Sequence, residues 1–353
     1  MNHRLFPGLA WQGVALCVAL AAVYTIAAEM SRQEAGADRL GLAALVSSLG
    51  FLILLVLATT ESGIARPWPW VAGWIVLGGF LVLHSRWPGR AWAQLAAGLG
   101  PAIGLCIAIG THGRDASALL PSAWLALVVF VAVVFQVLAV LARISDRYSW
   151  AERTAAATAL TLMIAAALVS STDRSAAMAC IATILILGLL ATLAATRLRS
   201  GLAYLAVVGA TAFWQTVVYF DAYRGLTAGS SPDVVFGLMA LSALLFTVWP
   251  AVVATAFRDS RYAWWGAALA GPFWFLALRS AFVALFGEEA IGLLPVALAA
   301  VALATVLWLR PRMAGSSESR RTALVWYLAV ALSLVSVAIP LQLDKQWITI
   351  GWA

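Results

Sequence analysis

The chain has 353 residues, of which 63% are hydrophobic and only 10% are charged, and its mean hydropathy is +0.95. A soluble domain carries about 25% charged residues, so this composition excludes an ordinary globular protein. A spanning helix uses roughly 20 residues, and twelve such helices would leave only short connections, which also excludes a large catalytic domain outside the membrane. We therefore expect an all-α, polytopic transmembrane protein.

The net charge of +7 does not indicate a nucleic-acid partner, because the 22 basic residues are scattered singly between apolar runs and form no basic stripe. Membrane lipid is the predicted partner, and no nucleic acid is expected. The cysteines and histidines are too dispersed for metal spacing, so neither a metal nor another cofactor is predicted. These residues are Cys17, Cys106, Cys180, His3, His84 and His112.

Twelve apolar runs are long enough to cross about 30 Å of hydrocarbon as helices. A thirteenth begins at Trp347. The twelve predicted spans are 9–28, 40–59, 68–84, 91–109, 118–141, 154–171, 176–195, 202–220, 234–257, 262–286, 291–309 and 322–339.

The first of these runs also has the order of a secretory signal peptide, since Arg4 precedes an apolar stretch that ends in Ala27 and Ala28. Its apolar run is longer than a usual signal sequence, and its stronger positive flank follows it. We therefore favour a first transmembrane helix over a cleaved signal.

Basic residues are distributed unevenly between alternate loops. Fifteen lie in the loops after the odd-numbered spans, six lie at the N-terminus and in the other loops, and Arg279 lies within a span, which accounts for all 22. Cytoplasmic loops carry the excess of Lys and Arg. The bias predicts that the N-terminus lies outside, and the 21 arginines beside the single Lys345, with abundant Ala, indicate a bacterial inner-membrane protein.

An internal repeat is suggested by matching anchors that are 166 to 174 residues apart. Arg90 and Pro101 match Arg261 and Pro272, and further matches are Leu-Leu-Pro at 119–121 and 293–295, Arg-Thr-Ala at 153–155 and 321–323, and Leu-Val-Ser at 168–170 and 334–336. Six spans separate equivalent points, so the units would be parallel. The predicted organisation is one transmembrane domain over 1–353 with repeat units at about 85–175 and 257–345. Chance similarity between Ala- and Leu-rich helices is the alternative.

The matched prolines carry a functional hypothesis. Pro101 and Pro272 lie eleven residues from their arginines, about 16 Å along a helix and near the bilayer midplane. Each proline frees a backbone carbonyl, and paired broken helices build the binding sites of several transporters. Simple packing is the competing interpretation, which the small-residue pattern Gly100-x-x-x-Gly104 supports.

Arg279 is the one ionisable residue well inside a predicted span, and such residues are functional candidates by default. Asp221, at the end of the 202–220 span, and Glu288 lie on the same predicted face, so a structural pair with Arg279 is favoured over a substrate site. Gln94 and Gln136 are predicted to form hydrogen bonds between helices.

A second hypothesis is a glycosyl or lipid-linked transferase that uses an outer carboxylate as general base. No paired-acid motif or metal cluster selects one of the candidates, so an enzyme is the less favoured interpretation. The outer candidates are Asp115, Asp173, Asp221, Asp233 and Asp344.

Several apolar motifs carry a family resemblance. The segment IPLQLDKQWITIGWA at 339–353, with Ala-Gly-Pro at 270–272 and Gly-Leu-Leu-Pro at 292–295, resembles the large bacterial membrane proteins of domain of unknown function 2339. In that family further helices follow the Trp-x-x-x-x-Trp-Ala segment. The resemblance implies an uncharacterised multi-helix inner-membrane protein of which this chain is a part truncated at its C-terminal end, and it transfers no catalytic residues.

The sequence thus favours a membrane protein that transports a small or lipid-linked solute. A transferase at the outer face and a non-catalytic scaffold subunit are the alternatives. A membrane-protein partner, or a missing C-terminal portion of the same protein, is a further expectation. The predicted substrate-binding residues are Pro101, Pro272, Asp221 and Arg279.

Overall fold

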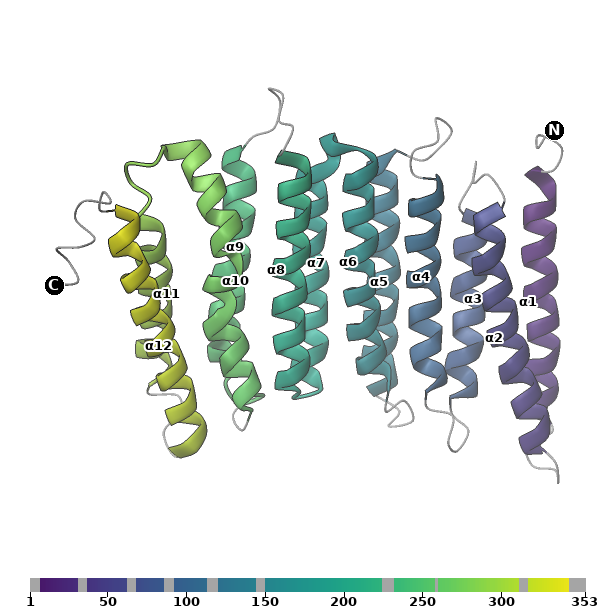
Figure 1. Cartoon of the computed structure of the whole chain (residues 1–353). Helices are drawn as coiled ribbons and strands as arrows, with labels where there is room; N and C mark the ends of the chain where they lie inside the picture. The colour runs from purple at the N-terminus through teal and green to yellow at the C-terminus, as the bar shows by residue number, and fades with distance from the viewer. Residues whose placement is uncertain are drawn as a thin grey trace. The chain divides into compact units, whose positions relative to one another are not determined.

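The computed structural model describes nine stretches of the chain, and in them every regular element is a helix (Figure 1). No strand occurs in these stretches. The described residues are 7–30, 37–61, 68–85, 92–112, 120–143, 150–223, 232–257, 260–310 and 317–342.

The described residues form twelve α-helices and one short 3₁₀ helix, η1 (Arg174–Ala176). The first six α-helices are α1 (Pro7–Met30), α2 (Ala37–Glu61), α3 (Trp68–His84), α4 (Ala93–His112), α5 (Pro121–Arg143) and α6 (Ala151–Thr172). The other six are α7 (Ala177–Arg197), α8 (Gly201–Tyr223), α9 (Pro232–Val252), α10 (Arg261–Phe286), α11 (Leu293–Leu309) and α12 (Ser317–Gln342).

Each of the twelve predicted runs contains a helix, and α3 has the predicted bounds. Two bounds are five residues off, since α12 begins at Ser317 and not at 322, and α9 ends at Val252 and not at 257. Past Val252 the chain continues in turns, and the Ala256 N–H donates to the Val253 carbonyl three residues earlier, so the apolar run is longer than the α-helix. The helix predicted to begin at Trp347 lies outside the described residues.

Eight of these helices are long and apolar enough to cross a membrane. Four others contain shorter apolar segments, namely Val14–Ala27, Gly41–Ile53, Val71–Leu83 and Leu293–Leu309. Large apolar side chains such as Leu276, Leu307 and Leu332 are about two-thirds exposed on the surface of these helices. Because water would penalise such exposure and lipid would not, the structure indicates a helical, membrane-embedded protein.

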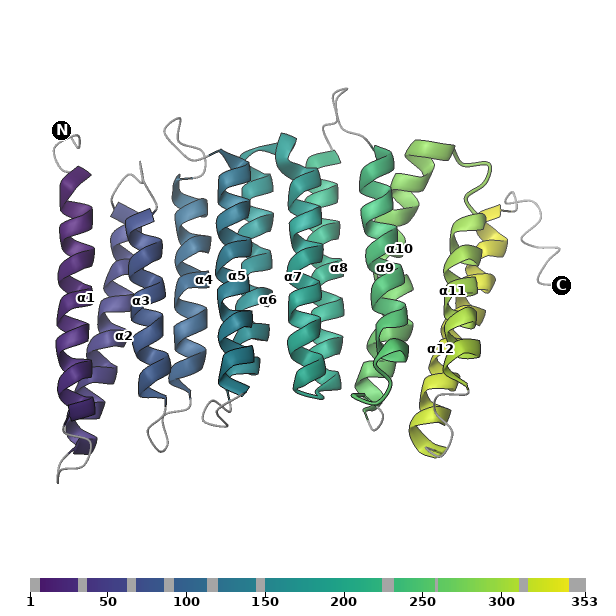
Figure 2. The same ribbon diagram turned by 180° about the vertical axis from the view of Figure 1, so that it is seen from behind.

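The chain divides into two compact units, Met1–Asp173 and Arg174–Ala353. We call them unit 1 and unit 2. Within each unit, consecutive helices run in opposite directions (Figures 1 and 2). In unit 1, α4 packs against α2, α3, α5 and α6, and in unit 2, α10 packs against α8, α9, α11 and α12. Each unit is therefore organised around one central helix.

Glycines allow the neighbours of α4 to approach its backbone closely. A Cβ atom added at Gly104 would lie 2.7 Å from the Trp74 ring of α3, and one added at Gly100 would lie 2.4 Å from Leu52 of α2. Small residues at helix contacts permit this kind of approach in membranes. The pattern Gly100-x-x-x-Gly104 therefore serves packing inside unit 1.

We predict that Gly104→Ala destabilises the protein by about 1–3 kcal/mol, because the methyl group overlaps a tryptophan ring that is almost fully buried. Gly110→Ala, in the same helix, is the matched control, since nothing lies within 4 Å of a Cβ at that position. The control should be neutral or slightly stabilising. Thermal unfolding of the purified protein in detergent measures both, and equal melting temperatures would contradict the contact.

Candidate functional site

The two matched prolines occupy equivalent helices in their units. Pro101 is buried within α4 of unit 1, and Pro272 is half-buried within α10 of unit 2. Pro101 removes the helical donor for the carbonyl of Ala97, and a Cβ on Gly78 of α3 would lie 3.2 Å from that oxygen. The freed carbonyl therefore faces a neighbouring helix at close range, which supports the packing interpretation for Pro101.

Asp221 and Arg279 both belong to unit 2, where they lie on the adjacent helices α8 and α10 and are exposed. The structural pair expected from the sequence is not observed. In the part of the chain that the structure describes, no ion pair joins Arg279 to Asp221 or to Glu288. The charge of Asp221 is therefore not neutralised by the residue that was expected to hold it.

A buried amide connects four helices of unit 2. The Gln215 side chain on α8 is fully buried, and its Nε2 donates to the carbonyl of Ile181 on α7 at 3.0 Å and to Ser242 Oγ on α9 at 3.1 Å. Its Oε1 accepts a hydrogen bond of 2.6 Å from the indole N–H of Trp274 on α10. Trp274 also stacks on Phe246 of α9, with ring centroids 5.5 Å apart. We call these residues the Gln215 network.

The predicted hydrogen bond of Gln94 is simpler. Its Nε2 donates to Ser85 Oγ at 2.9 Å and thereby joins the beginning of α4 to the end of α3. Gln136 is buried on α5. Gln215 was not singled out from the sequence, although an amide in an otherwise apolar helix is the same signal that identified Gln94.

Pro250 explains a second polar contact in the core of unit 2. Because it has no N–H, the carbonyl of Phe246 one turn earlier loses its helical donor. The hydroxyl of Tyr204 on α8 donates a short hydrogen bond to that carbonyl. The hydroxyl of Tyr327 on α12 donates to the next carbonyl, Thr247, at 2.7 Å. Two fully buried tyrosines thus satisfy the backbone of α9 beside its proline.

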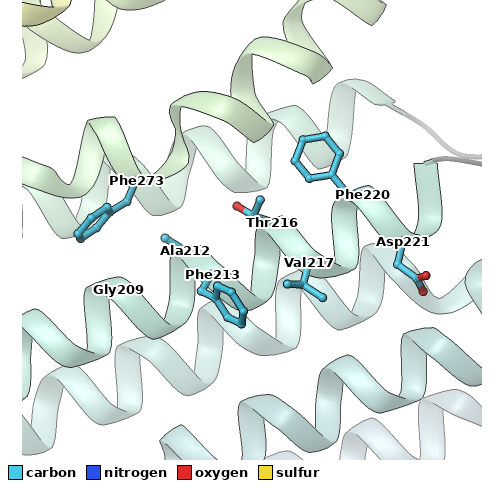
Figure 3. A pocket seen from close by; sticks show the side chains of 8 residues that line it. All are labelled: Gly209, Ala212, Phe213, Thr216, Val217, Phe220, Asp221 and Phe273. Atoms are coloured by element: carbon cyan, nitrogen blue, oxygen red, sulfur yellow. The ribbon is translucent and has the colours of Figure 1, made fainter.

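A groove of about 590 Å³ lies along α8 (Figure 3). Small side chains of α8 line it, together with aromatic rings from α8 and α10, and Asp221 lies at one end. We call it the α8/α10 groove. Its lining residues are Gly209, Ala212, Phe213, Thr216, Val217, Phe220, Asp221 and Phe273.

The groove is open to the surroundings of unit 2. Phe213 is 58% exposed, and Val217 and Phe273 are about two-fifths exposed. At the other end from Asp221, nothing lies within 4 Å of a Cβ added at Gly209, so this glycine leaves open space. From Gly209 to Asp221 the helix rises about 18 Å, more than half of the hydrocarbon thickness.

The groove contains only one of the four residues predicted to bind substrate. Asp221 lines it, whereas Pro101, Pro272 and Arg279 do not. Of the outer acids, Asp115 and Asp344 lie outside the described residues, and Asp233 lies in the first turn of α9. In the described stretches, no group of three His, Cys, Asp or Glu residues could hold a metal ion.

Comparisons with known proteins add no assignment, because no family model, curated protein or solved structure matches the chain. The resemblance to domain of unknown function 2339 therefore stays a prediction. The function is accordingly inferred from the α8/α10 groove.

We predict that Tyr204→Phe destabilises the protein by about 1–3 kcal/mol, because the Phe246 carbonyl is then buried without a donor. In a Pro250→Ala background the same substitution should cost less, since alanine supplies the helical N–H that proline lacks. A double-mutant cycle of thermal or denaturant unfolding in detergent measures this coupling. Equal costs in the two backgrounds would show that the tyrosine does not compensate for the proline.

Proposed function

We propose that the chain is a bacterial inner-membrane transport protein that binds a lipid-like or lipid-linked solute in the α8/α10 groove. The observation that carries the proposal is the groove itself, which is largely apolar, lies on a membrane-embedded helix pair and has one carboxylate at its end. Its volume of about 590 Å³ is within the range of small-molecule sites. A chain-like molecule could enter it sideways from the lipid.

The topology that we propose has twelve spans, one transmembrane domain and an external N-terminus. The excess of basic residues in alternate loops supports it. Asp221 would then lie at the outer interface, and the groove would run inward from it beyond the bilayer midplane.

We also propose the parallel six-helix repeat. The matched Gly-Pro pairs, Gly100-Pro101 and Gly271-Pro272, fall on α4 and α10, and these are the central helices of their units. Of the other anchors, Pro121 begins α5 and matches Pro295 on α11, and the Arg-Thr-Ala and Leu-Val-Ser anchors fall on α6 and α12, whereas Arg90 and Leu119 lie outside the described residues. This correspondence supports duplication of a six-helix unit over chance similarity.

The proposed topology predicts that reporters fused after Arg153 and after Asp233 lie on opposite sides of the membrane, the first inside and the second outside. Paired alkaline phosphatase and fluorescent protein fusions in a bacterial host measure the two positions. Finding both reporters on one side would defeat the twelve-span topology.

The proposed binding site predicts that Gly209→Leu blocks the groove. The new side chain meets open space, so the protein should fold normally while the inner end of the groove is filled. Gly237→Leu on α9 is the matched control, because it is an exposed helical glycine that also has nothing within 4 Å of a Cβ and does not line the groove.

The measurement is photolabelling in nanodiscs with dodecanol that carries a diazirine in its chain, followed by peptide mapping. Wild type and Gly237→Leu should be labelled along residues 209–221, and Gly209→Leu should lose about three- to tenfold of that labelling. Labelling of all three proteins to the same extent would mean that lipid contacts α8 without occupying a site. That outcome would favour a scaffold subunit.

A further inference from the structure

The lining of the α8/α10 groove carries charge of one sign, which is negative. Among its eight lining residues, Asp221 is the only charged one, and Thr216 is the only other polar side chain. The Thr216 hydroxyl oxygen is buried and has no hydrogen-bond partner among the described residues. Arg279 lies on α10 but is not part of the lining. From these eight lining residues, an occupant of the groove meets negative charge and no positive charge.

Among the described residues, no side chain pairs with the carboxylate of Asp221. No described cation pairs with it, and no basic residue lies in the last turn of α8. Asp221 is two residues from the end of that helix, where the helix dipole is negative and disfavours a carboxylate. The residue thus weakens the helix end slightly and has no ion-pair partner in the described structure, which points to a partner from outside the chain.

The rest of the lining suits an apolar body with a cationic end. Phe213, Phe220 and Phe273 present aromatic rings, whose faces attract organic cations and whose surfaces pack against alkyl chains (Figure 3). Gly209 and Ala212 add only small side chains to the lining, which leaves room for an occupant at that end of the groove. The length of about 18 Å from Gly209 to Asp221 accommodates a medium-length alkyl chain.

We propose that the solute of the α8/α10 groove is a lipophilic organic cation, with its apolar body along α8 and its ammonium group at Asp221. This inference rests on the proposed binding function of the groove and adds its chemical class. A zwitterionic phospholipid fits less well, because its phosphate would be brought next to the same carboxylate. An anionic amphiphile is disfavoured for the same reason.

The test compares three photoactivatable dodecyl probes with the same chain and different heads, namely trimethylammonium, hydroxyl and sulfonate. In wild-type protein in phosphatidylcholine nanodiscs, labelling of residues 209–221 should be about three- to tenfold stronger with the ammonium head than with the hydroxyl head. The sulfonate probe should label least.

The charge variants then assign the preference to one residue. In Asp221→Asn, the ratio of ammonium to hydroxyl labelling should fall close to one, and Asp221→Glu should restore most of it. Asp233→Asn is the matched control, because it removes another exposed aspartate, on α9, that does not line the groove. It should keep the wild-type ratio. Size-exclusion profiles confirm that each variant is folded.

The outcomes separate the class of solute from the existence of the site. If all three heads label the groove equally and Gly209→Leu still blocks them, the groove binds solutes but the cation assignment is wrong. If no probe labels the groove, the proposed function fails and this inference fails with it. Displacement of the ammonium probe by nanodiscs rich in phosphatidylethanolamine would identify bulk lipid as the occupant and would also overturn the inference.

Discussion

In hydrocarbon, a backbone carbonyl without a donor costs several kcal/mol, and the core of unit 2 is arranged around one such carbonyl. Pro250 deprives Phe246 of its helical donor, and Tyr204 supplies a hydroxyl in its place. Tyr327 donates to the neighbouring carbonyl of Thr247 from another helix. Hydrogen bonds to backbone carbonyls of α9 therefore hold α8 and α12 against it. Such bonds tolerate less displacement of the helices than the packing of apolar side chains does.

The two sides of α8 differ in burial and in hydrogen bonding. One side carries Tyr204 and Gln215, whose polar atoms are bonded to neighbouring helices and are fully buried. The other side carries Phe213, Val217 and Asp221, which line the groove and are exposed. Directional hydrogen bonds thus hold the buried side, and the groove lies along the exposed side of the same helix. A site on a rigid helix is also more precise than a site on a loop.

Much of the fold was predictable from the sequence. Continuous apolar runs predicted a helix in every segment where one is found, since a spanning helix must satisfy its backbone internally and needs a fixed length. The end of α9 was misplaced because the apolar run continues past Val252, where the backbone leaves the α-helix and forms turns. Hydropathy indicates whether a segment prefers an apolar environment, and it does not indicate whether the backbone N–H groups of that segment form helical hydrogen bonds.

The site was less predictable than the fold. Asp221 was identified because a charge at the end of an apolar run is conspicuous, but its expected pairing with Arg279 is absent from the described structure. The groove was not foreseen, since a hollow depends on small side chains such as Gly209 lying beside rings from another helix. Gln215 was likewise missed, although an amide within an apolar span marked it, and its partners on α7, α9 and α10 could not be read from the sequence.

Three consecutive residues of α10 have different structural roles, namely Pro272, Phe273 and Trp274. Pro272 interrupts the helical ladder, Phe273 lines the groove, and Trp274 donates to Gln215 in the buried network. A molecule that pushes Phe273 aside acts on the same peptide segment that orients the Trp274 indole, at the point where the helix is easiest to bend. The lining of the groove and the buried contacts among α7, α8, α9 and α10 are thus joined by adjacent residues of one proline-containing segment.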